Sequence, residues 1–468
     1  MNFSLLTVEM LTAGLALSLL LADLLLPPGQ RRQLGCLALA GLGAVLVYAL
    51  GLYGSRETFY QGLFRLDDYA VFFKQLFLLA AILTIGFSFD YVERLQRRQG
   101  EFYFLLLLTV VGMMLMAAAN DFLTLYVGME LMAVSFFILT GMGSGCLSSE
   151  AGLKYLLIGA ASTAVFLFGV SLLFGAAGSF AWPQLMSRAV YSPAALTGMA
   201  LVFAGLLFKV ASVPFHMWAP DVYEGAPVPV TAMLAMASKA AGFAALTRLA
   251  MQAADIAVFN WPPLIAALAA LSMVAGNLLA IAQTNLKRLL AYSSIAQAGY
   301  LLAGLAAAGE AGVKGLLFYA MVYVFANAGA FAVVTAVHLN EQSDEISAYS
   351  GLARRAPLLA AAMTVSLLSM AGIPVLAGFV GKFYLFSAAV DNGLLWLAFL
   401  GFVMSMLSVY YYLMVVKSMY LGQPPAAHLP YSGGLGWVAL VSMTLTVLCG
   451  LYPEPLARLA AGAAKALF

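Results

Sequence analysis

Apolar segments of about 20 residues follow one another along nearly the whole chain, with short polar segments between them. A segment of this length can cross a bilayer as an α-helix, and because lipid offers the backbone no hydrogen-bond partner, each helix must satisfy its own backbone groups. The composition agrees, since 64% of the residues are hydrophobic and 9% are charged, whereas about a quarter of a soluble domain is charged. The short alternating segments of a membrane β-barrel are absent from the sequence. The sequence therefore predicts an all-α membrane protein.

Turn residues and charges divide the apolar segments into about 14 predicted transmembrane helices. Their predicted ranges are 4–26, 34–52, 69–89, 102–118, 122–142, 153–174, 195–218, 228–251, 264–282, 289–308, 313–338, 358–390, 394–419 and 435–451. The first range lacks a preceding basic region and carries Glu9, which favours a retained helix over a cleaved signal peptide. Lysine and arginine are in excess in the inner loops if the N-terminus is outside, so we expect both termini on the outer side.

A lysine close to a helix-breaking proline marks the segment that says most about function. Lys209 lies in an otherwise apolar stretch, and Pro214, five residues later, removes a helical N–H group and tends to break the helix. A lysine at the centre of a bilayer costs about 3 kcal/mol, so its presence indicates a hydrated interior in which the charge has a role. A kinked helix whose lysine reaches the headgroups is the structural alternative.

Further ionisable side chains fall within predicted helices. Glu130 lies near the middle of its helix, and an opposite charge on a neighbouring helix would lower its cost, so we expect it to pair with Lys209 or Lys154. A static ion pair is the structural alternative for Glu130. Lys239 has small neighbours, which leave room for close helix packing and for water. Because burial lowers the pKa of a lysine, whereas arginine keeps its proton, lysine is suited to a proton relay.

The second half of the chain repeats this pattern with the order reversed. Gly372 and Pro374 interrupt an apolar helix, and Lys382 follows the proline by eight residues. Two interrupted helices that each carry a lysine are typical of internal repeats whose broken helices line a site near the membrane midplane. His216 could pass protons between Lys209 and bulk water, or it could be a hydrogen-bonded histidine at a helix end, and both alternatives stay open.

The remaining polar residues give weaker evidence for a functional site. His338 and His428 fall at loop edges, where we expect solvated side chains, and Glu9 and Lys74 lie near the starts of their helices, where we expect their charges to reach the headgroups. Three isolated cysteines cannot form an iron–sulfur cluster, a zinc site or a disulfide framework. The sequence has no nucleotide-binding motif and no basic face, so we expect no bound cofactor, no metal and no nucleic-acid partner.

Several motifs in order along the chain carry a family resemblance. They are DFLTLYVGMELMAVSFF, SEAGLKYLLIGA, FKVASVPFHMWAPDVYEGAP, NLKRLLAYSSIAQAGYLL and MAGIPVLAGFVGKF. Together they resemble the antiporter-like subunits of the proton-pumping respiratory NADH:quinone oxidoreductase, complex I. The DVYEGAP turn, the lysine at position 382 and the lack of a long C-terminal extension make the chain most similar to the N-type subunits of the bacterial enzyme.

The resemblance implies a fold and a set of proton-carrying positions. It implies two inverted five-helix repeats, made of helices 4–8 and 9–13, with helices 7 and 12 broken. The implied domains are 1–100 for the N-terminal helices, 101–255 and 256–420 for the two repeats, and 421–468 for a C-terminal helix. The implied proton-carrying residues are Glu130, Lys154, Lys209, Lys239 and Lys382. Relatives often have histidine where this chain has Gln297, which can hydrogen-bond to water but cannot carry the proton.

We therefore expect a proton-translocating subunit that couples quinone reduction in other subunits to proton transfer and has no redox centre of its own. The resemblance implies that NADH, FMN, iron–sulfur clusters and quinone bind to partner subunits, that the other membrane-arm subunits are its partners, and that the chain lies in a bacterial inner membrane. With the orientation given by the lysines and arginines, both termini then face the periplasm. The alternatives are a subunit of a multisubunit Na⁺/H⁺ antiporter or membrane-bound hydrogenase, or a membrane scaffold that pumps nothing.

Overall fold

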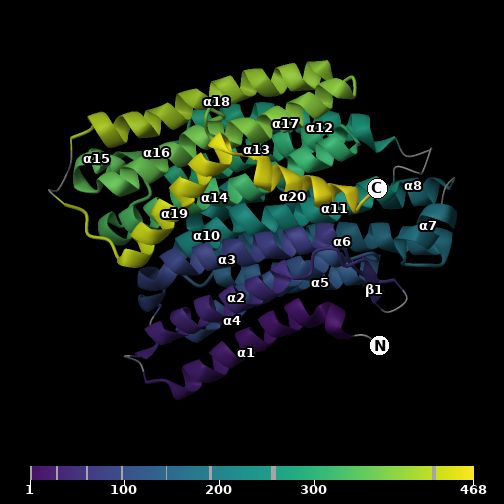
Figure 1. Ribbon diagram of the computed structural model, residues 1–468, viewed down its shortest axis with the longest axis horizontal. Helices are drawn as coiled ribbons and strands as arrows, with labels where there is room; N and C mark the ends of the chain where they lie inside the picture. The colour runs from purple at the N-terminus through teal and green to yellow at the C-terminus, as the bar shows by residue number, and fades with distance from the viewer. Residues whose placement is uncertain are drawn as a thin grey trace.

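The computed structural model describes residues 3–27, 30–59, 62–95, 98–143, 145–188, 192–253, 260–423 and 428–468. These residues form a bundle of helices that run in a common direction, with the loops gathered at its two ends (Figure 1). Among the described helices, 12 are long and apolar enough to cross a membrane, and the shorter apolar helices Pro193–Lys209 and Pro357–Ala371 lie with them. The prediction of an all-α membrane protein is confirmed.

The helices of the first half are α1 (Thr7–Leu25), α2 (Arg32–Leu50), α3 (Asp68–Glu93), α4 (Gln99–Ala118), α5 (Phe122–Thr140), α6 (Cys146–Ala177), α7 (Trp182–Arg188), α8 (Pro193–Lys209), α9 (Trp218–Gly225), α10 (Val228–Met233) and α11 (Lys239–Ala253). Those of the second half are α12 (Trp261–Ile281), α13 (Leu286–Ala306), α14 (Glu310–Glu341), α15 (Leu352–Arg355), α16 (Pro357–Ala371), α17 (Ala377–Asp391), α18 (Leu395–Leu421), α19 (Gly433–Leu451) and α20 (Glu454–Lys465). The shorter elements are the helical turns η1 (Phe3–Leu6), η4 (Leu234–Ser238) and η5 (Ile346–Tyr349) and the antiparallel strands β1 (Glu57–Phe59) and β2 (Phe64–Leu66).

Both helix interruptions that the prolines predicted are present. The first separates α8, which ends at Lys209, from α9, and the second separates α16, which ends at Ala371, from α17. At the second break Gly372 has a φ of 86°, which residues with a Cβ rarely adopt, and its N–H donates to the Leu368 carbonyl. A helix that ends inside the membrane leaves its last carbonyl groups without helical partners, so other donors must reach them.

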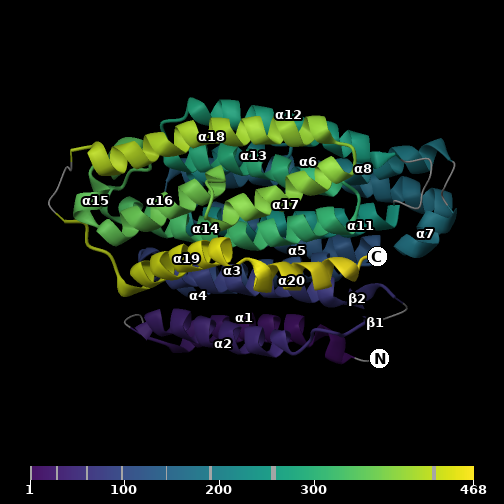
Figure 2. The same cartoon turned by 45° about the horizontal axis from the view of Figure 1, so that its top comes forward.

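The helices lie in layers. In Figure 2, α1 and α2 form one outer layer and α12 and α18 the opposite one. Between them lie the span of α10, η4 and α11 and the long helix α14, both of which are buried over their apolar length. Two spans without a lipid-facing side can carry polar groups that an outer helix could not, so these central helices are where a polar interior is possible.

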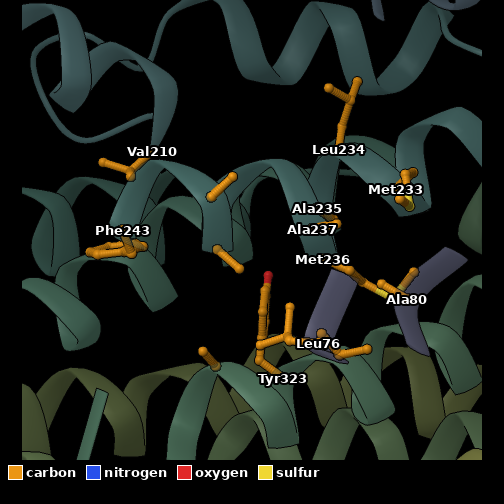
Figure 3. Packing of buried hydrophobic residues seen from close by; sticks show 14 of the residues in the cluster. Leu76, Ala80, Val210, Met233, Leu234, Ala235, Met236, Ala237, Phe243 and Tyr323 are labelled. Atoms are coloured by element: carbon orange, nitrogen blue, oxygen red, sulfur yellow. The ribbon is translucent and has the colours of Figure 1, made fainter. Parts of the chain in front are cut away.

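The turn η4 is π-helical and lies in this central layer. Its residues pack against Leu76 and Ala80 of α3 on one side and near Tyr323 of α14 (Figure 3). Alanines at 235 and 237 allow the close approach of these helices. A π-helical turn inside a helix often marks a functional site, and this one ends directly before Lys239.

The sequence analysis missed the β1–β2 hairpin and the last helix. In α20 the residues that face the bundle are alanines, and they pack against α3 and α14. Such a short helix of small and charged residues has no apolar run for a hydropathy pattern to detect. The first and last described residues lie at the same end of the bundle (Figure 1), as the expectation of both termini on one side requires.

Candidate functional site

Lys239 begins α11 in the centre of the bundle and is 3% exposed. Its Nζ donates a hydrogen bond to Ser294 Oγ of α13 at 2.6 Å and lies 5.9 Å from the ring centroid of Tyr223. A small cavity beside Lys239 and Ser294, also lined by Gln297 and Tyr323, leaves about 10 Å³ for the centre of a water molecule. One water needs about that much room. Lys239 therefore has one fixed hydrogen-bond partner and room for a water that could exchange protons with it.

Lys209 is the last residue of α8 and is 2% exposed. Its Nζ has no hydrogen-bond partner among the described residues and lies 5.8 Å from the ring centroid of Phe208. Gly242, one turn along α11 from Lys239, faces it, since a Cβ on Gly242 would lie 3.4 Å from the Cβ of Lys209. An unpartnered buried ammonium is costly, so this is a place where water or the loss of a proton would lower the energy.

Glu130 of α5 is half-buried and accepts a hydrogen bond from Thr163 of α6 at 2.7 Å. Its charge interacts electrostatically with Lys209, but the direct ion pair with Lys209 or Lys154 that the sequence suggested is not formed within the described part of the chain. An interaction across a gap changes steeply when the gap changes in a medium of low dielectric constant. A small movement of α5 against α8 would therefore alter the energy of the Lys209 ammonium.

Lys154 lies apart from the buried lysines. Its Nζ is 2.7 Å from Glu150 and 2.8 Å from Asp221, and its side chain is 42% exposed. Arg288 also binds Asp221, at 2.9 Å, and Glu224, at 2.6 Å. Burial would raise the pKa of the Asp221 carboxyl, but the hydrogen bonds from Lys154 and Arg288 and their charges hold this pKa below its usual range. This network fixes the turn between α9 and α10 at the end of the bundle.

Lys382 follows the second helix break and is 3% exposed. Its Nζ donates to the carbonyls of Met370 at 2.8 Å and Ala371 at 3.1 Å and to Ser405 Oγ at 2.8 Å, and it lies 4.3 Å from the ring centroid of Tyr300. Met370 and Ala371 are the last residues of α16, where carbonyls lack helical partners and carry the negative end of the helix dipole. The break predicted from the proline therefore supplies the acceptors that stabilise this buried ammonium.

Gln297 of α13 connects the surroundings of Lys239 and Lys382. It lines the cavity beside Lys239, and its Nε2 donates to the Met370 carbonyl at 3.0 Å, the same oxygen that accepts from Lys382. The Tyr319 hydroxyl donates to its Oε1. Polar atoms thus extend from Lys239 to Lys382, joined by the cavity between Ser294 and Gln297 and by hydrogen bonds from Gln297 onward, although Gln297 itself cannot be protonated at neutral pH.

The histidines take different places. His216 lies in the break between α8 and α9, is 9% exposed, and forms no hydrogen bond or ion pair with Lys209 in the described chain. His428 is exposed, as expected. His338 is partly exposed, with 29% of its side chain accessible, and its Nδ1 lies 2.8 Å from Asp344 Oδ1, a partner that the sequence did not indicate.

Buried ion pairs outside this site were missed by the sequence analysis. Glu9 of α1 and Lys74 of α3 lie 2.8 Å apart with side chains 5% and 0% exposed, so the prediction that both reach the headgroups is wrong. Arg248 of α11 is fully buried and binds both carboxylate oxygens of Asp67, at 2.8 and 2.7 Å. The sequence did indicate that Arg248 lies within the predicted helix 228–251, but its partner Asp67 is far away in the sequence and could not be identified from it.

A metal centre is not evident either. Within the described ranges, no group of three or more His, Cys, Asp or Glu side chains could hold a metal ion. The free cysteines Cys36 and Cys146 are exposed, and Cys449 is partly buried.

Comparisons with known proteins agree with this geometry. Residues 119–408 match the family described as NADH:quinone oxidoreductase/Mrp antiporter, TM. The chain is 55% identical over 473 aligned positions to NADH-quinone oxidoreductase subunit N of Heliobacterium modesticaldum, with 100% of each protein covered. A chain of respiratory complex I from Thermus thermophilus with bound aureothin is 35% identical, with a TM-score of 0.84, and 97% of this chain and 99% of that chain are covered. A chain of the archaeal membrane-bound sulfane sulfur reductase is 25% identical, with a TM-score of 0.91, and 100% of this chain and 98% of that chain are covered. The chain therefore belongs to the family of NADH:quinone oxidoreductase and Mrp antiporter membrane subunits, together with the N subunits of NADH-quinone oxidoreductase.

Proposed function

We propose that this chain is a proton-translocating subunit, a translocase component, of a respiratory NADH:quinone oxidoreductase. The observation that carries the proposal is the set of polar atoms between two buried lysines, from Lys239 through Ser294 and Gln297 to the Met370 carbonyl and Lys382. Ionisable groups are rare inside membranes and mark proton or ion paths. Lysine can release and rebind a proton in such a site, whereas arginine would keep it.

The energy for transfer comes from quinone reduction in other subunits and reaches this chain as a change in conformation or charge. Glu130 and Lys209 are where this change acts, because they interact without a direct ion pair. At an effective dielectric constant of 20, two unit charges interact by about 4 kcal/mol at 4 Å and by about 2 kcal/mol at 8 Å, so a movement that changes the distance between them can displace a proton. The proton leaves Lys209 Nζ and binds Lys239 Nζ, and Lys239 passes a proton to Lys382, which releases it outside.

In this proposal Gln297 orients water along the path and does not itself carry the proton. Its amide is fixed by the Met370 carbonyl and by the Tyr319 hydroxyl, so it can orient the water in the cavity beside Lys239. The proton then moves through that water, which can accept and donate in turn.

The setting is part of the same proposal, and the excess of lysine and arginine in the predicted inner loops supports the placement of both termini outside. The partners are the other membrane-arm subunits and the bilayer, the location is the bacterial inner membrane, and both termini face the periplasm. NADH, FMN, iron–sulfur clusters and quinone are bound by partner subunits. We assign 1–100 to the N-terminal helices, 101–255 and 256–420 to two inverted repeats and 421–468 to the C-terminal region, and the helix break in each of the two middle ranges supports the repeats.

Changing the central lysines tests the proposal in membrane vesicles that contain the complete complex. Lys239→Met and Lys382→Met are expected to lower the number of protons moved per NADH and the quinone reduction coupled to it. Lys417→Met is the matched control, because Lys417 is exposed at the end of α18. The amount of assembled complex is measured for each variant. Normal proton yield in fully assembled Lys239→Met and Lys382→Met complexes would show that the chain is a scaffold and not a relay.

A second candidate, transport of sodium ions by an antiporter-like assembly, is favoured by the match of residues 119–408 to a family whose description includes the Mrp antiporter. Sodium uptake into vesicles that depends on this chain, and that stops when the proton gradient is removed, would support it. A proton yield that is independent of sodium concentration would favour proton transfer alone.

A further inference from the structure

A second cluster of ionisable side chains lies at one end of the bundle, beside the turn between α9 and α10. Lys287 of α13 has its Nζ 3.1 Å from Asp344 Oδ2 and donates to the Ala226 carbonyl at 3.1 Å. The other carboxylate oxygen of Asp344 lies 2.8 Å from Nδ1 of His338. The side chains of His338, Asp344 and Lys287 are 29%, 12% and 4% exposed. The cluster therefore leads from the aqueous surface into the protein in the order imidazole, carboxylate, ammonium.

Lys287, the most buried residue of this cluster, lies on the same helix as Ser294, the hydrogen-bond partner of Lys239. Lys287 and Ser294 are seven residues apart on α13, so they lie on the same face and about 10 Å apart along the helix axis. Ser294 accepts the hydrogen bond from Lys239.

The turn between α9 and α10 contacts both lysines. Ala226 accepts the hydrogen bond from Lys287, and the ring of Tyr223, three residues earlier, lies beside the Nζ of Lys239. The Tyr223 hydroxyl is buried and interacts with Ser294, the residue that also accepts the hydrogen bond from Lys239. Tyr223 and Ser294 therefore place two hydroxyl groups together beside Lys239, on the side that faces Lys287.

We propose that His338, Asp344 and Lys287 take up protons from the aqueous phase and deliver them to Lys239. The inference rests on the proposed relay and adds the residues through which protons enter it. After Lys239 has passed the proton that came from Lys209 to Lys382, the Lys287 ammonium gives a proton to neutral Lys239 through the Tyr223 and Ser294 hydroxyls and water, and Lys239 returns a proton to neutral Lys209. Neutral Lys287 is then refilled through the Asp344 carboxylate and the His338 imidazole, which takes one proton from water. One proton enters for each that leaves, and the cluster returns to its first state.

The surroundings keep Asp344 ionised. The other titratable or charged groups around the cluster are Tyr91 of α3, Arg94 directly after α3, Glu341 of α14 and Tyr349 of η5. Glu341 is bound by Arg355 and Arg94 donates to the Leu339 carbonyl, so neither is free to replace the Asp344 pair. Burial would raise the pKa of the Asp344 carboxyl, but the hydrogen bond from His338 and the charge of Lys287 hold this pKa below its usual range. A carboxylate that stays charged attracts a proton to the imidazole beside it.

The Lys287→Arg variant distinguishes two possible roles of Lys287, as a proton carrier and as part of a structural ion pair. Lys287→Arg keeps a cation beside Asp344 but does not release its proton, whereas Lys287→Met removes the cation. In vesicles with the complete complex, we expect both variants to lose as many protons per NADH as Lys239→Met loses. His338→Gln is expected to lower the proton yield as well, because glutamine can keep a hydrogen bond to Asp344 but cannot bind a proton.

The control is Glu93→Gln, which breaks an exposed ion pair with Arg32, whose atoms lie 2.9 Å apart, and leaves the cluster intact. A normal proton yield in assembled Lys287→Arg and His338→Gln complexes, together with a low yield in Lys239→Met, would overturn the uptake site and leave the relay standing. A normal yield in Lys239→Met would overturn the relay and the uptake site with it. A low yield in Lys287→Met but a normal yield in Lys287→Arg would show that the cluster is only structural.

Discussion

Replacing Ser294 by alanine tests the first step between the central lysines. Ser294 Oγ accepts a hydrogen bond from Lys239 Nζ at 2.6 Å, and both residues are almost fully buried. A hydrogen bond to a charged group contributes about 1.5–3 kcal/mol, and each 1.4 kcal/mol is about a tenfold change in an equilibrium. Because this bond stabilises the ammonium, its loss is expected to lower the ratio of charged to neutral Lys239 by about 10- to 150-fold.

The assay for Ser294→Ala is the number of protons moved per NADH in vesicles, measured across a range of pH. We expect a reduced yield at neutral pH that recovers as the pH falls, because a higher proton concentration restores the ammonium. Ser442→Ala is the matched control, since Ser442 is equally buried and its hydroxyl has no hydrogen-bond partner in the described chain. Wild-type yield in Ser294→Ala at every pH, with normal assembly, would refute the assignment of this hydrogen bond to the proton path.

The remaining predictions concern stability and assembly. Arg248→Ala is expected to destabilise the subunit by about 3–5 kcal/mol, because the buried Asp67 carboxylate loses its bidentate partner, and adding Asp67→Asn is expected to restore part of the melting temperature of the complex. Gly378→Ala is expected to reduce the amount of assembled complex, because the new Cβ would lie 1.9 Å from a backbone oxygen, whereas Gly14→Ala, with nothing within 4 Å, is expected to assemble normally. The lowered pKa of Asp344, in which hydrogen bonding and charge outweigh burial, means that its ionised form contributes stability above about pH 4 that is lost as the pH falls further. Asp344→Asn is therefore expected to flatten the drop in melting temperature between about pH 3 and 5.

The position of Lys154 changes how the site is understood. The resemblance implied that it carries protons with the other lysines, but its Nζ lies between Glu150 and Asp221 at the end of the bundle. Exposed ion pairs contribute about 0–1 kcal/mol each, although several in a network hold a geometry better than one. Lys154 therefore positions the turn whose other side contacts Lys287 and Lys239.

The structural features that follow from local chemistry could be predicted from the sequence. The length of each apolar segment predicts a spanning helix, because the backbone has no other way to satisfy its hydrogen bonds in lipid. Pro214 and Pro374 predict the breaks, because proline lacks the N–H group that a helix needs. Lys209, Lys239 and Lys382 stand out because an ammonium is rare and costly in hydrocarbon, so its presence in an apolar segment can be recognised before its partner is known.

The partners of the charges were decided only by the tertiary structure. Arg248 and Asp67 are 181 residues apart in the chain, and Lys154 and Asp221 are 67 apart, so no spacing rule could pair them. Electrostatic energy depends on distance in space and on the surrounding dielectric, and both are set by how the helices pack. The apolar sequence thus determined that the chain forms membrane helices with buried lysines, whereas the packing of α8, α11, α13 and α16 determined which acceptors each lysine meets.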